Sequence, residues 1–167
     1  IVHVTLHLGI RAALDQIDTA RIVRALKAAD AALRRIGISG PRISVSGVNP
    51  HAGEEGLFGN EEIEVVTPAI EKARLDGVDA EGPFGADTMY LDESYDAYAV
   101  MYHDQGHIPA KLLGFNRTAA FAVGTPILFS SVAHGSALDI AGRGKADPAG
   151  LIWTLKQISG AAAREEA

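Results

Sequence analysis

Short apolar runs of strand length alternate along this chain with longer segments in which apolar residues recur at helical spacing. The runs lie at residues 1–7, 42–47, 78–81, 98–102 and 119–123, and the helical segments at residues 18–37, 61–76, 109–113 and from 148 onward. This alternation predicts an α/β fold with a layered, largely parallel sheet and flanking helices. We see no internal repeat and no linker, and therefore expect residues 1–167 to form a single α/β unit.

The composition narrows the classes of protein to which the chain can belong. Hydrophobic residues make up 47% of the 167 residues, which suits a substantial core. The net charge of -6 argues against nucleic acid, whose phosphates attract lysine and arginine. There are no cysteines, so any metal must be held by His, Asp or Glu, and we expect a cytoplasmic protein. No apolar run approaches the roughly 18 residues that span a bilayer, so no membrane association is expected.

Three of the six histidines share one kind of position. His7, His51 and His103 each lie at or just past the carboxyl end of a predicted strand. Ligands of open α/β sheets bind outside those ends, and three converging imidazoles would form a metal site with positions left for substrate. Each could instead be a solvated loop histidine, because spacing alone does not show convergence. We interpret His3 as a half-buried structural residue and His107 as a capping or supporting one.

Long motifs then resemble a known family. Residues 49–54 (NPHAGE), 59–63 (GNEEI), 101–106 (MYHDQG) and 134–142 (HGSALDIAG) are similar, in order, to motifs of the PdxA family of 4-hydroxythreonine-4-phosphate dehydrogenases. The last is also similar to the nucleotide loop of isopropylmalate and isocitrate dehydrogenases. The resemblance covers nearly the whole chain but only the second half of the family's longer chains. The chain, which opens at Ile1 within a predicted strand, is thus expected to be the carboxy-terminal half of a two-domain dehydrogenase.

The resemblance implies a homodimer with a shared metal site. The family holds a divalent metal with three histidines, two from one subunit and one from its partner. By motif position these are His7, His51 and His103 of the partner subunit. Zinc suits imidazole ligands best, and Mn, Co, Ni or Mg are alternatives.

The resemblance also implies catalytic residues. Lys111 matches a family lysine that contacts substrate, where an ammonium would stabilise a developing alkoxide or move its proton. It could instead lie on a solvated helix face. Asp104 could orient His103 or relay a proton, and Asp87 matches a family acidic position. Both aspartates could equally be turn or cap residues.

A glycine-rich loop near the carboxyl end is the candidate cofactor site. By resemblance, NAD or NADP would be bound by His134, Gly135, Ser136, Ala137 and Asp139. The small residues let the backbone approach a ligand, and Asp139 could accept hydrogen bonds from adenosine. Without the resemblance, a glycine-rich loop of this kind would be interpreted as a plain turn. Arg143 and Lys145 could pair with the 2′-phosphate of NADP or be surface charges.

Two positions depart from the phosphate-recognising members. An asparagine and an arginine hold substrate in those enzymes, and this chain has Ala120 and Phe129 instead. Phenylalanine cannot replace an arginine fork on a phosphate. The chain here resembles the terephthalate dihydrodiol dehydrogenase-like branch, which lacks the pair.

We therefore expect metal- and NAD(P)-dependent oxidation, with decarboxylation, of a secondary alcohol. The small-molecule substrate would be 4-phosphohydroxythreonine, of pyridoxine biosynthesis, or a non-phosphorylated cis-dihydrodiol carboxylate. One alternative is a tri-histidine metallohydrolase, which needs no nicotinamide. Another is a non-catalytic, metal-binding dimeric fragment, inactive alone.

Overall fold

The computed structural model describes residues 1–114, 117–124, 127, 129–132 and 135–159. The chain forms two compact units, Ile1–Ile108 and Pro109–Ala167. The strands and α-helices of the first unit are β1 (Val2–His3), α1 (Ile10–Asp15), α2 (Thr19–Arg35), β2 (Arg42–Ser46), α3 (Thr67–Leu75), β3 (Asp79–Phe84) and β4 (Ala97–Val100). Shorter helical turns span Pro50–Gly56, Glu62–Val66 and Met89–Leu91. Helix α4 (His103–Gly114) starts in this unit.

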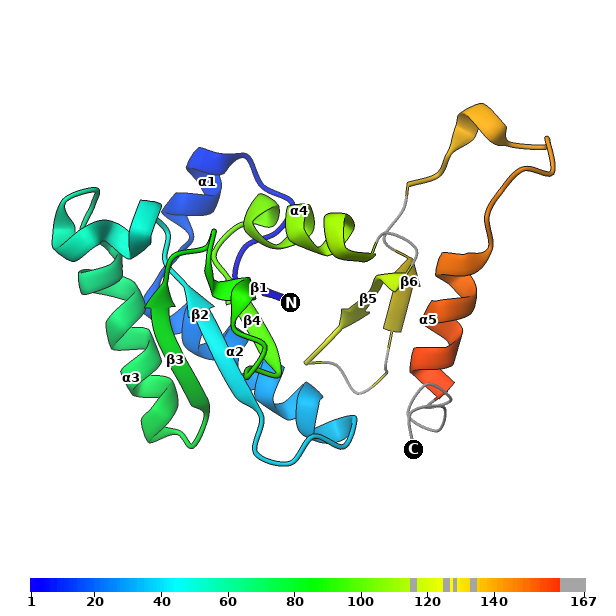
Figure 1. The fold of residues 1–167 in the computed structure, drawn as a ribbon. Coiled ribbons are helices and arrows are strands. Elements are labelled where there is room, and N and C mark those ends of the chain that lie inside the picture. The colour runs from blue at the N-terminus through cyan, green and yellow to red at the C-terminus, as the bar shows by residue number, and fades with distance from the viewer. Residues whose placement is uncertain (115–116, 125–126, 128, 133–134, 160–167) are drawn as a thin grey trace. The chain divides into compact units, whose positions relative to one another are not determined.

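The sheet of the first unit is entirely parallel. Its strand order is β1-β4-β2-β3, with Val2 paired to Ala99 and Ile43 paired to Ala97. Because neighbouring strands run in the same direction, the carboxyl ends of β1, β4 and β2 lie along one edge (Figure 1). The predicted α/β fold with a parallel sheet is confirmed.

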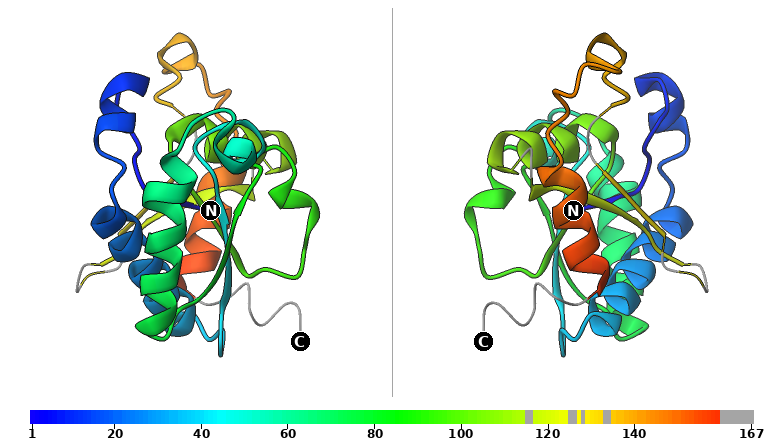
Figure 2. Two further views of the ribbon diagram at one scale, coloured as in Figure 1. Left: turned by 90° about the vertical axis from the view of Figure 1, so that its left-hand side faces the viewer. Right: turned by 90° about the vertical axis from the view of Figure 1, so that its right-hand side faces the viewer.

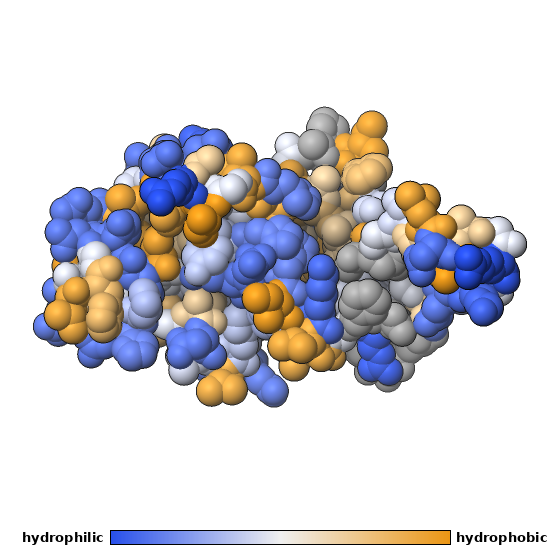
Figure 3. Space-filling view, turned by 90° about the horizontal axis from the view of Figure 1, so that it is seen from above, coloured by the Kyte–Doolittle hydropathy of each residue, from blue (hydrophilic) through white to orange (hydrophobic). Residues whose placement is uncertain are grey.

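Helices α2 and α3 pack together against one face of this sheet (Figures 1 and 2). Asp18 begins α2, and its side chain accepts a hydrogen bond of 2.6 Å from the backbone N–H of Arg21, which satisfies one of the unpaired donors of the first turn. The core between helices and sheet consists of small and branched apolar side chains, including Ile22, Leu26, Ile43, Val45, Val66 and Ile70. On the face that Figure 3 shows, exposed hydrophobic residues are interspersed among hydrophilic ones.

The helix predicted over residues 61–76 is divided, as its proline predicts. A π-helical turn over Glu62–Val66 precedes α3, and Pro68 lies in the first turn of α3. Pro68 has no N–H to donate to the preceding turn, so a regular α-helix cannot continue through this point without losing a hydrogen bond. The division gives Glu62 a place in a turn of its own, next to the loop that follows β2.

The second unit contains a hairpin and a helix. Strands β5 (Ala119–Ala122) and β6 (Phe129–Val132) pair antiparallel, and α5 (Ala149–Ser159) follows a short turn at Leu138–Ile140. The sequence predicted β5 and α5 but not β6, because two serines interrupt the apolar alternation of that strand. No helix among the described residues is long and apolar enough to cross a membrane.

Leu26 tests the importance of the α2–sheet core. Its side chain is fully buried, whereas Leu75, at the end of α3, is 88% exposed. Leu26→Ala should lower the free energy of unfolding by about 2–5 kcal/mol, because it leaves a cavity in the core. Leu75→Ala should change it by less than about 0.5 kcal/mol. Denaturant unfolding of both variants measures the difference, and equal losses would contradict the described packing.

Candidate functional site at the carboxyl edge of the sheet

The three candidate metal histidines follow three neighbouring parallel strands. His7 follows β1, His51 follows β2, and His103, the first residue of α4, follows β4. Each histidine thus comes after the carboxyl end of a strand, as predicted, but β1 is shorter than the expected strand over residues 1–7 and ends at His3, four residues before His7. Since β1, β4 and β2 are adjacent in the sheet, the fold brings the segments that carry these histidines to one edge.

His7 and His103 belong to a cluster of four imidazoles within one chain. The ring centroids of His7 and His103 are 5.6 Å apart, and those of His103 and His107 are 4.3 Å apart. His3 stacks on His107 with a centroid distance of 4.7 Å. Burial, together with the charge of His107, lowers the pKa of His3 to about 4, so His3 is neutral at ordinary pH. The prediction of a half-buried His3 is confirmed, and its Nε2 is buried without a hydrogen-bond partner.

Two of the three candidate ligands are paired with a carboxylate through the same ring nitrogen. Nδ1 of His103 lies 2.6 Å from Oδ1 of Asp104, and Nδ1 of His51 lies 2.9 Å from Oε2 of Glu54. A carboxylate accepts hydrogen bonds, so in the neutral form of each imidazole Nδ1 carries the proton and Nε2 keeps its lone pair. This tautomer suits a metal ligand. Asp104 therefore contacts His103 as one of its two predicted roles requires, and Glu54 is a partner that the sequence analysis missed.

His51 lies in a left-handed helical turn. Residues 51–55 all have positive φ, between 45° and 82°, and only Gly53 among them lacks a side chain. Left-handed conformation costs a residue with a side chain about 1–2 kcal/mol, so the turn needs support from its surroundings. The rings of His51 and Phe58 contact edge to face at 6.1 Å.

The buried carboxylate of Glu62 lies beside this turn. Glu62 is only 3% exposed, and its Oε1 accepts hydrogen bonds from the backbone N–H groups of Val48 at 2.6 Å and Asn49 at 2.7 Å. Its Oε2 accepts a third, at 3.0 Å, from the side-chain amide of Asn49. Burial raises the pKa of Glu62, but these hydrogen bonds outweigh burial and hold the pKa below its ordinary value. Glu62 is thus a buried anion inside the candidate site.

Gln105 joins the ends of two strands. Its Oε1 accepts a hydrogen bond from the backbone N–H of Met101 at 2.9 Å, just past β4, and its Nε2 donates to the carbonyl of Gly47 at 2.9 Å, just past β2. The amide thereby ties the segment leading to His103 to the segment leading to His51. Sequence reasoning missed Gln105 and Glu62, because most of their partners are backbone groups that no residue pattern reveals.

The remaining predicted catalytic residues are exposed. Asp87 lies in the loop after β3, close to Gly85, which also approaches the Cα of His51. Lys111 is exposed on the part of α4 that belongs to the second unit. Within the part of the chain that the structure describes, no three His, Asp or Glu side chains are grouped to hold a metal.

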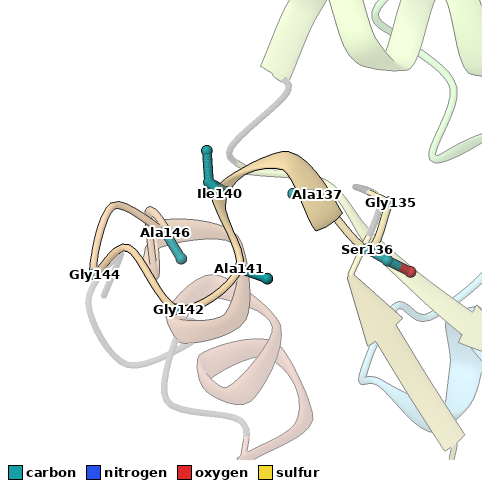
Figure 4. A pocket seen from close by; sticks show the side chains of 8 residues that line it. All are labelled: Gly135, Ser136, Ala137, Ile140, Ala141, Gly142, Gly144 and Ala146. Atoms are coloured by element: carbon teal, nitrogen blue, oxygen red, sulfur yellow. The ribbon is translucent and has the colours of Figure 1, made fainter.

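The glycine-rich loop of the second unit lines an open pocket (Figure 4). Its lining residues are Gly135, Ser136, Ala137, Ile140, Ala141, Gly142, Gly144 and Ala146. Apart from the hydroxyl of Ser136, the side chains shown there carry no polar atom, so polar recognition would come mainly from backbone groups. Ala137 is left-handed, with φ of 45°. Asp139 is exposed and does not line the pocket, and His134 lies outside the described residues.

Comparison with known proteins decides the family. The model of the family described as "Pyridoxal phosphate biosynthetic protein PdxA" matches residues 1–158. The chain belongs to the PdxA family. It is 46% identical over 159 residues to D-threonate 4-phosphate dehydrogenase of Pectobacterium atrosepticum, covering 93% of this chain and 49% of that protein.

Two further PdxA-type relatives differ in the substrate that their names give. The 1,2-dihydroxy-3,5-cyclohexadiene-1,4-dicarboxylate dehydrogenase of Comamonas sp is 45% identical over 155 residues, covering 93% of this chain and 49% of that protein. The crystal structure of 4-hydroxythreonine-4-phosphate dehydrogenase from Klebsiella pneumoniae matches with a TM-score of 0.84 at 45% identity, covering 93% of this chain and 48% of that one. The chain thus spans about half the length of these relatives.

The charge of Glu62 should make stability depend on pH. Because the folded pKa lies below the unfolded one, the carboxylate contributes stability above the ordinary value of 4.5, and this contribution is lost as pH falls through the folded pKa. Glu62→Gln should therefore lower the free energy of unfolding by about 1.5–3 kcal/mol near neutral pH. The difference in free energy of unfolding between Glu62→Gln and the unsubstituted chain should become smaller as the pH is lowered. Exposed Glu64 provides the control, as Glu64→Gln. If this difference in free energy of unfolding stayed constant with pH, the charge of Glu62 would contribute nothing to stability.

Proposed function

We propose that the full protein carrying this chain is a divalent-metal- and NAD(P)-dependent dehydrogenase that oxidises a secondary alcohol. The observation that carries the proposal is the convergence of three histidine-bearing segments on one sheet edge in a member of the PdxA family. The dehydrogenase names of its relatives support the reaction class. In this proposal the chain is the carboxy-terminal half of a two-domain enzyme.

The metal would be held by Nε2 of His7 and His51 together with His103 of the partner subunit. The carboxylate partners of His51 and His103 support this assignment, because they leave Nε2 available. Three imidazoles suit zinc best, with Mn, Co, Ni or Mg as alternatives. A bound divalent ion would act as a Lewis acid that lowers the pKa of the substrate hydroxyl. A site with its third ligand from a second copy makes the working unit a homodimer.

The other residues would orient substrate and cofactor. Asp104 would keep the ring of His103 in one tautomer through its 2.6 Å hydrogen bond. Lys111 would place an ammonium near the substrate oxygen, where it can stabilise negative charge or accept the hydroxyl proton once deprotonated, and Asp87 would be an alternative proton acceptor. The pocket of Gly135, Ser136 and Ala137 would bind NAD or NADP, with His134 and Asp139 nearby, so that hydride can pass to nicotinamide.

The substrate would be a non-phosphorylated diol, such as a cis-dihydrodiol carboxylate. Ala120 pairs with Ser131, and Ala122 pairs with Phe129, so Ala120 and Phe129 lie on the same face of the β5–β6 hairpin. Neither side chain can donate a hydrogen bond to a phosphate. An exposed phenylalanine offers an apolar surface to a ring instead.

Mixing two variants tests the shared metal site. His7→Ala and His103→Ala should each abolish tight zinc binding. A mixed dimer of the two would hold one intact site and one lacking both histidines, so random exchange of subunits should restore about one quarter of the sites. Equilibrium dialysis against zinc after subunit exchange measures this.

The matched control mixes His7→Ala with His51→Ala, which damage the same half of the site and should restore nothing. If instead His103 of the same chain were the ligand, as the 5.6 Å approach of its ring to His7 permits, neither mixture would recover binding.

Restoring the missing polar pair tests the substrate. The combined substitution of Ala120→Asn and Phe129→Arg should raise kcat/KM of the full protein for 4-phosphohydroxythreonine by about 100-fold or more, because each hydrogen bond to the charged phosphate contributes about 1.5–3 kcal/mol. Phe121→Arg is the control, since Phe121 lies on the opposite face of the hairpin. Efficient oxidation of the phosphorylated substrate by the unsubstituted protein, with none of a cis-dihydrodiol, would contradict the assignment.

A further inference from the structure

We propose that Glu62 is the positioning residue of His51: its carboxylate holds the left-handed turn that aims this imidazole at the metal. The inference rests on the proposed function for the role of His51. It assigns to Glu62 no contact with metal or substrate.

The contacts of Glu62 bracket His51 along the chain. On the amino-terminal side, Oε1 accepts the N–H groups of Val48 and Asn49, the last residues before Pro50 and His51. On the other side, Oε2 lies over Gly53: a methyl group added at Gly53 would approach that oxygen to 2.5 Å. A single carboxylate thus restrains the chain just before and just after the histidine.

The turn is also pressed onto the end of β2. A methyl group added at Gly47 would come within 2.8 Å of both Ala52 Cα and Oε1 of Glu62. Gly47, Ala52 and Glu62 are therefore packed too closely for the turn to shift toward the sheet. Because a left-handed turn is unfavourable for His51 and Ala52, it persists only where such contacts outweigh its cost.

Both the negative charge and the shape of the Glu62 side chain are needed to restrain the turn at residues 51–55. In all three hydrogen bonds Glu62 is the acceptor. An anionic carboxylate can fill this role with both of its oxygens. A glutamine of the same size would turn one N–H group toward Asn49 Nδ2, also a donor, or toward Gly53. Glu62→Gln therefore loosens the turn without opening a cavity.

The test measures zinc affinity of the full chain by competition with a chromogenic chelator. Glu62→Gln should weaken binding about 10–100-fold, as loss of a group that orients a metal ligand does, while exposed Glu64→Gln should leave it unchanged. In a His51→Ala background, where the measured affinity is the weak residual one of the remaining histidines, Glu62→Gln should weaken binding no further, because the ligand that it positions is gone. Equal affinities of the Glu62→Gln and Glu64→Gln chains, or an undiminished effect of Glu62→Gln without His51, would overturn the inference.

Hydrogen exchange of the metal-free chain separates this inference from the proposed function. The amides of Leu57 and Phe58 donate to the carbonyls of Glu54 and Gly53, so they report on the turn. They should exchange about 5–30-fold faster in Glu62→Gln, and unchanged exchange would overturn the inference. If His51→Ala kept full zinc affinity while exchange rose as expected, the metal site would fail but the hold of Glu62 on the turn would stand.

Should Glu62→Gln prevent folding, Asn49→Ala applies the same test more mildly. It removes the 3.0 Å hydrogen bond to Oε2 of Glu62 and the 2.6 Å hydrogen bond from the same amide to Oε2 of exposed Glu61, and it leaves both backbone donors to Oε1 of Glu62 in place. A smaller loss of zinc affinity in the same direction, absent in the His51→Ala background, supports the inference. Unchanged affinity in Asn49→Ala overturns it.

Discussion

The parallel pairing of β1, β4 and β2 is the constraint on which the candidate site depends. Parallel strands place their carboxyl ends along one edge, so segments distant in sequence meet there without any contact of their own. The buried layer of α2 and α3 holds the strands in register, and Gln105 ties the exits of β4 and β2 together. The candidate site at the carboxyl edge thus depends on the core formed by the sheet with α2 and α3, and on the side-chain amide of Gln105.

A buried anion and a left-handed turn would each be costly alone, and here they support one another. Glu62 needs donors to remain charged away from water, and the loop after β2 supplies three of them. The turn at residues 51–55 needs restraint, and the carboxylate supplies it from both sides. Such mutual dependence is typical of functional sites, where strain persists because the surroundings determine the conformation.

Much of this architecture could be predicted from the sequence, because it depends on local patterns. The helical spacing of apolar residues predicted α2 together with its Asp18 cap. Pro68 predicted that the helix over residues 61–76 is divided, and the predicted strands placed the three histidines after strand ends. Strand β6 escaped prediction because its two central serines interrupt the apolar alternation by which a strand is recognised. The roles of Glu54, Glu62 and Gln105 escaped because a glutamate or glutamine reads as a solvent-facing residue until its partners are placed in space. The family motifs supplied candidate site residues, but they did not reveal that His51 lies in a left-handed turn.

The most direct test of the metal site is the location of zinc by anomalous diffraction from crystals of the full protein. The account predicts one ion per site, about 2.0–2.1 Å from Nε2 of His7 and His51 of one subunit and His103 of the partner subunit. An ion bound by the His3–His107 pair, or none at the carboxyl edge of the sheet, would contradict it.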